Sequence, residues 1–122
     1  MSGYVLVAFG GALGSVCRYF ISRQFATKIV STFPWGILLC NVLGCFLMGC
    51  VVGFFASRAG YASIWRPGVC IGFLGGFTTF SSFGLDTLML GQQSAWHLAV
   101  LNILLTVVFS LLATVAGFYL AR

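Results

Sequence analysis

Four long apolar runs constrain this chain of 122 residues more than any other feature of its sequence. Hydrophobic residues make up 61% of the chain and charged residues only 6%, a balance far outside that of a water-soluble domain. A bilayer core of about 30 Å needs roughly 20 apolar residues in helical form, and each run reaches that length. The sequence therefore predicts an all-helical integral membrane protein, a single domain over residues 1–122 with spans of about 3–24, 35–56, 67–90 and 95–120.

The first of these runs is expected to remain in the protein as a span. A signal peptide carries basic residues before its apolar stretch, whereas Arg18 and Arg23 lie at the far end of this run. All five cysteines also fall inside apolar runs, where free cysteine packs as a small hydrophobe. We therefore expect neither a disulfide framework nor a cysteine metal site.

The six basic residues divide almost evenly between the two sides of the predicted membrane. Three lie on the side shared by both termini, and two or three on the other, because Arg18 is close enough to its helix end to snorkel. Two alternatives follow: insertion in both orientations, with antiparallel pairing about a twofold axis in the membrane plane, or one weakly biased topology. The net charge of +5 thus concerns topology and not nucleic acid. The residues are Arg58, Arg66 and Arg122 on the first side, and Arg23 and Lys28 on the other.

The segment "GFLGGFTTFSSF", Gly72–Phe83, lies in the middle of the third span, whose centre falls at Thr79. Gly75 and Gly76 weaken a helix, and two β-branched threonines follow at once, so the segment predicts an unwound turn at the bilayer midplane. Carbonyls freed by such a break must be buried in protein, line water or coordinate an ion. In an antiparallel pair two such breaks meet at the twofold axis, where a structural sodium ion is expected.

Close helix packing is the alternative explanation for the glycines of this segment. Gly68, Gly72 and Gly76 are spaced by four and form a face of small residues. This packing does not explain the threonine and serine hydroxyls that follow, nor Phe80 and Phe83, which share one helix face.

Polar residues also occur in the other spans. Asn41 in the second span either joins two helices or faces a wet path. Arg18 is either a snorkelling anchor or a charge at the mouth of an aqueous vestibule. Asp86, the one carboxylate, suits an ion pair or a vestibule better than catalysis, and no nucleophile with an adjacent base indicates an enzyme. The fourth span carries a row at every fourth position that forms either a polar track or self-bonded hydroxyls: Asn102, Thr106, Ser110 and Thr114.

A path lined by hydroxyls, an amide and phenyl rings suits a small anion. A cation pore would normally show rings of acidic residues. The edge of a phenyl ring is electropositive, so a ring that presents its edge helps to replace the hydration shell of an anion.

With these motifs the chain resembles the Fluc, or CrcB, family of fluoride channels. The resemblance covers essentially its whole length and rests on "GGALGSVCRY" at Gly10–Tyr19, on "NVLG" at Asn41–Gly44 and above all on Gly72–Phe83. It implies an antiparallel, dual-topology dimer in the lipid of a prokaryotic plasma membrane. It also implies two parallel, passive pathways that export fluoride, exclude chloride and give fluoride resistance.

The resemblance also implies roles for individual residues. Phe80 and Phe83 match the pore phenylalanines, Asn41 a pore amide, and Arg18 a vestibule arginine. Leu74 and Phe77 occupy variable places, and Asp86 stands where a glutamate is common. Some members are heterodimers, whereas the even charge distribution favours a homodimer here. The remaining matches are Ser81, Ser110 and Thr114 at polar pore positions, and Gly75 and Thr78 as carbonyl donors to a structural Na⁺ at the dimer twofold.

Two other classes of protein share the size and composition of this chain. A small antiparallel, proton-coupled drug exporter needs a membrane-embedded carboxylate, but the first span has none and Asp86 is alone. A structural protein whose glycine faces only pack helices would tolerate conservative changes at Phe80 or Asn41.

Overall fold

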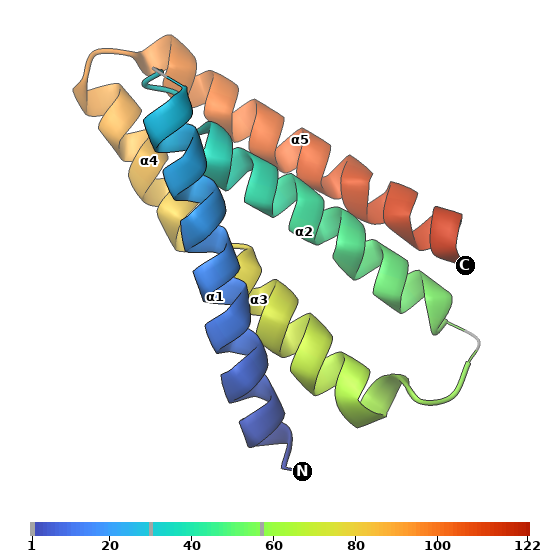
Figure 1. Ribbon diagram of the computed structural model, residues 1–122. Coiled ribbons are helices and arrows are strands. Elements are labelled where there is room, and N and C mark those ends of the chain that lie inside the picture. The colour runs from blue at the N-terminus through green and yellow to red at the C-terminus, as the bar shows by residue number, and fades with distance from the viewer. Residues whose placement is uncertain (1, 30, 57) are drawn as a thin grey trace.

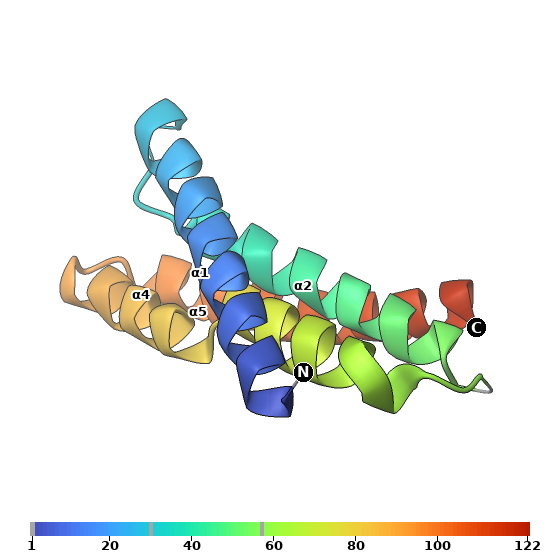
Figure 2. The ribbon, with the colours of Figure 1, turned by 60° about the horizontal axis from the view of Figure 1, so that its bottom comes forward.

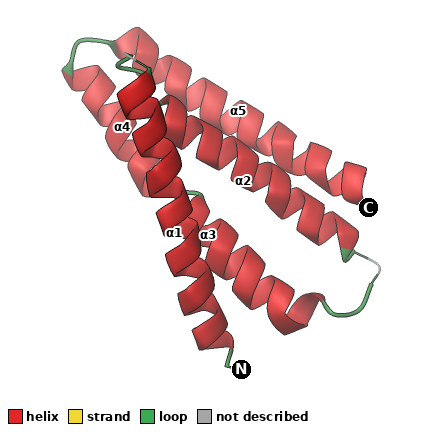
Figure 3. Ribbon diagram, viewed as in Figure 1, coloured by secondary structure: helices red, strands yellow, loops and turns green. Residues whose placement is uncertain are grey.

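The computed structural model describes residues 2–29, 31–56 and 58–122, and every regular element in these ranges is a helix (Figure 3). Four helical stretches are long and apolar enough to cross a membrane, which confirms the predicted all-helical architecture. The third stretch is made of three consecutive helical elements, whereas the second and the fourth are each one continuous helix. In chain order the elements are α1 (Gly3–Lys28), α2 (Trp35–Phe54), η1 (Tyr61–Leu74), α3 (Gly75–Phe77), α4 (Phe80–Gln92) and α5 (Trp96–Ala121).

The third stretch begins earlier than the sequence suggests. Its first element, η1, starts at Tyr61 and contains Pro67, near which the span was expected to begin. The backbone here is wound as a π-helix, and the N–H of Gly75 still reaches the carbonyl of Cys70 five residues before it. Proline lacks an N–H group, so the helical ladder around Pro67 is short of one donor.

The spans alternate in direction. Figure 1 shows the two termini and the α2–η1 connection toward the lower right, and the α1–α2 and α4–α5 connections at the upper left. The turned view of Figure 2 keeps these two groups at opposite ends of the molecule. The basic residues near the termini and the α2–η1 connection therefore share one end, as the four-span topology requires.

Glycines bring the helices into backbone contact along two seams. On the seam between α2 and α5, a Cβ atom at Gly117 would collide with the carbonyl oxygen of Phe46. On the seam between α1 and the third stretch, a Cβ atom at Gly14 would collide with the carbonyl oxygen of Phe73, and one at Gly76 would lie 2.6 Å from the carbonyl oxygen of Gly11. The expected packing face thus exists, and it lies against α1.

Candidate functional site at the interrupted helix

The helix of the third stretch is interrupted at Thr78 and Thr79. Helix α3 ends at Phe77 and α4 begins at Phe80. Between them the backbone is extended, with φ −88° and ψ 154° at Thr78 and φ −153° and ψ 125° at Thr79. Two residues in this conformation release several carbonyl and N–H groups from the helical ladder, so neighbouring groups must satisfy them.

The two threonine hydroxyls close the helix ends on either side. Thr78 donates to the carbonyl of Leu74 through both its N–H (3.0 Å) and its hydroxyl (2.9 Å). The hydroxyl of Thr79 caps α4 by accepting the N–H of Ser82 at 3.2 Å, and it lies 3.1 Å from the hydroxyl of Ser81. Part of the hydroxyl cluster in the sequence is therefore explained by capping.

Asn41 of α2 holds the extended segment from one side. Its side-chain oxygen accepts the N–H of Thr79 at 2.7 Å, and its amide nitrogen donates to the carbonyl of Thr79 at 3.0 Å. The Asn41 side chain is 7% exposed, so both bonds are largely shielded. One turn later, Gly44 makes room for the same segment, because a Cβ atom there would collide with the methyl group of Thr78.

Arg18 of α1 holds the segment from the other side. Its Nε–H donates to the carbonyl oxygen of Gly76 at 3.0 Å. This carbonyl belongs to the last turn of the first half-helix, where partial negative charge accumulates. Arg18 is half-buried and thus lies beside the break rather than free in solvent.

A groove of about 440 Å³ opens beside the break and gathers several of the predicted pathway residues. Phe80 and Phe83 stand on its wall with ring centroids 5.4 Å apart, Phe83 buried and Phe80 81% exposed. The exposed ring of Phe80 therefore leaves the groove open on this side within one chain. The lining comprises Asn41, Cys45, Gly75, Thr78, Thr79, Phe80, Phe83, Thr106, Val107, Ser110 and Leu111.

Ser110 of α5 contributes a free hydroxyl to this groove. Its Oγ atom is buried and has no hydrogen-bond partner among the described residues. A buried hydroxyl without a partner costs free energy unless something in the site bonds to it. Thr114, one turn further, donates to the carbonyl of Ser110 at 2.9 Å and lies outside the groove.

The other two residues of the α5 row tie α5 to α4. Asn102, 1% exposed, donates to the hydroxyl of Thr87 at 3.0 Å, and that hydroxyl donates to the carbonyl of Phe83 at 2.8 Å. Thr106 donates to the side-chain oxygen of Asn102 at 3.3 Å. The row is therefore divided between a helix-joining network and the groove, and only Thr106 and Ser110 line the groove.

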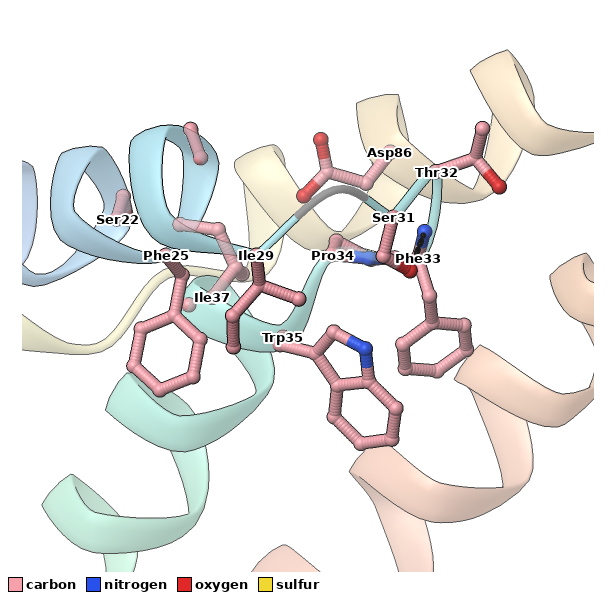
Figure 4. A pocket seen from close by; sticks show the side chains of 12 residues that line it. Ser22, Phe25, Ile29, Ser31, Thr32, Phe33, Pro34, Trp35, Ile37 and Asp86 are labelled. Atoms are coloured by element: carbon pink, nitrogen blue, oxygen red, sulfur yellow. Dashed lines mark hydrogen bonds between the residues drawn. The ribbon is translucent and has the colours of Figure 1, made fainter.

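Asp86 belongs to a different cavity, of about 260 Å³, between the end of α1, the α1–α2 connection and α4. Figure 4 shows its carboxylate on one side of that connection and the rings of Phe25 and Trp35 on the other. Ser22, whose Oγ is also buried without a partner, lines the same cavity. The one carboxylate is thus separate from the groove at the break.

Backbone carbonyls, not side chains, are the cation ligands that the break offers. In the described residues no three histidine, cysteine or acidic side chains gather as a metal site. Because the N–H of Thr79 bonds to Asn41, the carbonyl of Gly75 loses the donor that a helix would provide. Gly75 and Thr78 both line the groove, and carbonyl oxygens are the donors that unwound membrane helices use for sodium, so these two residues fit such an ion.

The structure brings together most of the predicted site residues. Four predicted pathway residues and the two predicted carbonyl donors line the groove, Arg18 lies at the break, and Ser81 and Thr114 lie beside the groove. Sequence reasoning missed Cys45 and the pairing of Asn41 with Thr79. The position of Cys45, four residues after Asn41 on one helix, is a signal that would have found it.

Comparison with known proteins identifies the family. Residues 5–118 match the family described as CrcB-like protein, Camphor Resistance (CrcB). The fluoride-specific ion channel FluC of Magnetococcus marinus is 43% identical over 116 residues, covering 95% of this chain and 94% of the relative. The protein of the same name from Citrifermentans bemidjiense is 39% identical over 122 residues, covering 100% and 98%. That from Vibrio campbellii is 41% identical over 114 residues, covering 93% and 90%. With the match extending over nearly all of its length, the chain belongs to the CrcB family.

Proposed function

We propose that this protein is a passive fluoride channel that exports F⁻ from the cytoplasm and so confers fluoride resistance. The observation that carries the proposal is the groove at the interrupted helix, where two phenylalanines and the free hydroxyl of Ser110 meet. The relatives with about 40% identity are named fluoride-specific ion channels, which supports the same conclusion.

The chemistry of the groove favours an anion. Fluoride is small and accepts strong hydrogen bonds, and the hydroxyl of Ser110 is a donor that no protein group uses. The phenyl rings of Phe80 and Phe83 contribute electropositive edges in place of water. No carboxylate of the described residues lines this groove, so an anion meets no fixed negative charge there.

Export needs no energy source other than the membrane potential. Hydrogen fluoride crosses membranes as a neutral acid and dissociates in a cytoplasm that is less acidic than the medium. An inside-negative potential then drives the trapped anion outward with about 2.3 kcal/mol per charge per 100 mV.

The assembly that we propose is an antiparallel homodimer in the prokaryotic plasma membrane, surrounded by lipid, with the third helix broken at the bilayer midplane. The position of Phe80 supports it, because its ring lines the groove at the break and is 81% exposed, so a second chain packed there would close the groove. In the same dimer the carbonyls of Gly75 and Thr78 from each chain would hold a structural Na⁺, whose positive charge would compensate the carbonyl oxygens freed at the break.

The proton-coupled exporter receives no support from the site. Such a carrier binds its substrate and its proton at a carboxylate inside the membrane. Asp86 lines a separate cavity at the end of α1 and does not reach the groove at the break.

The deciding experiment measures passive efflux from liposomes that contain only this purified protein. One set is loaded with fluoride and one with chloride. Phe80→Ile tests the groove, and Phe9→Ile, at an exposed phenylalanine of α1 outside the groove, is the matched control. We expect rapid fluoride efflux, no chloride efflux, and a collapse in Phe80→Ile but not in Phe9→Ile.

Equal fluoride and chloride efflux would contradict selectivity. Unchanged efflux in Phe80→Ile would contradict the location of the path. Absence of fluoride efflux together with proton-dependent uptake of an organic cation would replace the channel with the exporter.

A further inference from the structure

The carbonyl groups around the break are divided between two kinds of environment. Side chains of neighbouring helices bond the carbonyl of Gly76 and both backbone groups of Thr79. Gly75 and Thr78, one residue before each of these, line the groove, and their carbonyls lose their helical donors because the N–H groups of Thr79 and Ser82 bond to side-chain oxygens instead. The division follows from two residues only, Arg18 on α1 and Asn41 on α2.

We propose that Arg18 and Asn41 are positioning residues that hold the break open in the one conformation that leaves the Gly75 and Thr78 carbonyls for a cation. This inference rests on the proposed function, because it concerns how the chain shapes the sodium site of that channel. In this proposal neither side chain contacts the sodium ion.

Asn41 prevents the break from closing into a continuous helix. In a helix the N–H of Thr79 would bond to the carbonyl of Gly75, but Asn41 accepts that N–H at 2.7 Å. The same side chain returns a donor to the Thr79 carbonyl at 3.0 Å. A single amide thus replaces two ladder bonds of one residue, and only an amide offers both a donor and an acceptor at this spacing.

Arg18 fixes the end of the first half-helix. Its Nε–H donates a charge-assisted hydrogen bond of 3.0 Å to the Gly76 carbonyl. Without this bond, the carbonyls of both Gly75 and Gly76 would lack a donor. The guanidinium also opposes the partial negative charge at this helix end. Nε makes this contact, and within the described residues neither Nη group forms a hydrogen bond, so a vestibule charge and a positioning role are compatible in one side chain.

The experiment measures how sodium stabilises the purified protein. Melting temperatures of the folded dimer are recorded across sodium concentrations at constant ionic strength, with potassium as the replacement cation, and fluoride efflux is measured in parallel. The variants are Arg18→Met, which removes the donor, and Asn41→Leu, which removes both the acceptor and the donor of the amide. Arg23→Met removes an exposed arginine further along α1 and is the matched control.

We expect the sodium concentration needed for half of the stabilisation to rise about tenfold or more in both variants, because Arg18→Met removes a charge-assisted hydrogen bond and Asn41→Leu removes two hydrogen bonds. Arg23→Met should match the wild type. The loss of fluoride efflux in Arg18→Met should be equal at low and high ionic strength, because salt does not replace the missing hydrogen bond to Gly76. If Arg18→Met gives no folded dimer, Arg18→Lys, which keeps a donor on a different geometry, should show an intermediate shift.

Two results would overturn the inference while leaving the channel intact. One is wild-type fluoride efflux without any sodium dependence of stability. The other is an unchanged sodium dependence in Arg18→Met with a flux defect that disappears at high salt, which would make Arg18 a vestibule charge only. A wild-type protein without fluoride efflux would instead overturn the proposed function.

Discussion

Helices α2 and α5 lie side by side as two unbroken rods, whereas α1 lies against a span that is interrupted along its course (Figure 1). Both pairs are joined by glycines that let backbone touch backbone, at Gly117 on the first seam and at Gly14 on the second. Beside the second seam, side chains also bond the backbone of the interrupted span: Arg18 of α1 bonds Gly76, and Asn41 of α2 bonds Thr79.

The difference shows that packing two helices closely and bonding the free backbone groups of an interrupted helix require different residues. Small residues alone suffice where the helical ladder is complete, because every backbone group is already bonded within its helix. Where the ladder stops, neighbouring helices must supply donors and acceptors, and here they come from α1 and α2. Glycine-rich motifs in the sequence therefore mark both seams, but only the polar residues mark the site.

The largest expected effect comes from filling either seam. Gly117→Ala and Gly14→Ala each place a methyl group against a backbone carbonyl, so we expect each to destabilise the folded protein by about 3 kcal/mol. Thermal unfolding of the purified protein measures this. Gly84→Ala, at a helical glycine with no atom within 4 Å of its added Cβ, is the control and should be neutral or slightly stabilising. Equal melting temperatures for Gly14→Ala and Gly84→Ala would show that the α1 seam can move apart.

The two unpartnered hydroxyls separate ligand binding from packing. Ser110 lies in the groove at the break, and Ser22 in the cavity near Asp86. We expect Ser110→Ala to lower fluoride efflux about tenfold, since a hydrogen bond to a charged partner contributes about 1.5–3 kcal/mol, and Ser22→Ala to leave it unchanged. A flux that is insensitive to both substitutions would mean that neither hydroxyl donates to the anion.

The network between α4 and α5 should act on stability more than on the ion. Removing the amide in Asn102→Leu takes away the donor to the Thr87 hydroxyl, which still bonds the Phe83 carbonyl, and leaves the Thr106 hydroxyl without its acceptor. Hydrogen bonds between membrane helices contribute about 0.6–1.7 kcal/mol, so we expect a loss of about 1 kcal/mol. A double-mutant cycle with Thr87→Val in thermal unfolding measures the coupling. Strict additivity of the two substitutions would contradict a shared network.

The smallest effect is expected at the one carboxylate. Asp86→Asn keeps the shape of the side chain and lies outside the groove, so fluoride efflux should change less than about twofold, consistent with a surface or vestibule charge screened by salt. Liposome efflux at low and high ionic strength checks this. A complete loss of transport at both ionic strengths would instead support a carrier mechanism with Asp86 as its proton site.

The sequence predicts the architecture well because its physical basis is local. Run length and hydropathy determine the number of spans, and these agree with the structure. The bounds of the third stretch differ, since its helix begins at Tyr61 and continues through Pro67. Proline at the start of an apolar run suggests a helix beginning, but a wider winding accommodates it here.

The site is predicted less completely because its bonds join residues far apart in the chain. The motif Gly72–Phe83 indicates the interrupted segment, and Asn41 stands out as an amide among apolar residues. Nothing local indicates that Asn41 bonds Thr79 or that Arg18 bonds Gly76, because these pairs are 38 and 58 residues apart. The even spacing of the α5 row likewise allows either a polar track or self-bonded hydroxyls, and the structure divides the row: Asn102 bonds Thr87 of α4, whereas Thr114 bonds the backbone of its own helix at Ser110.

The exposed ring of Phe80 has a consequence for the cell. In the proposed dimer this ring and the groove that it lines would be covered only after two chains meet, so a lone chain would lack a closed pathway. While chains are sparse, the number of pathways then grows with the square of the amount of protein made. A modest rise in gene expression under fluoride stress would therefore produce a disproportionate rise in fluoride tolerance, until nearly all chains are paired.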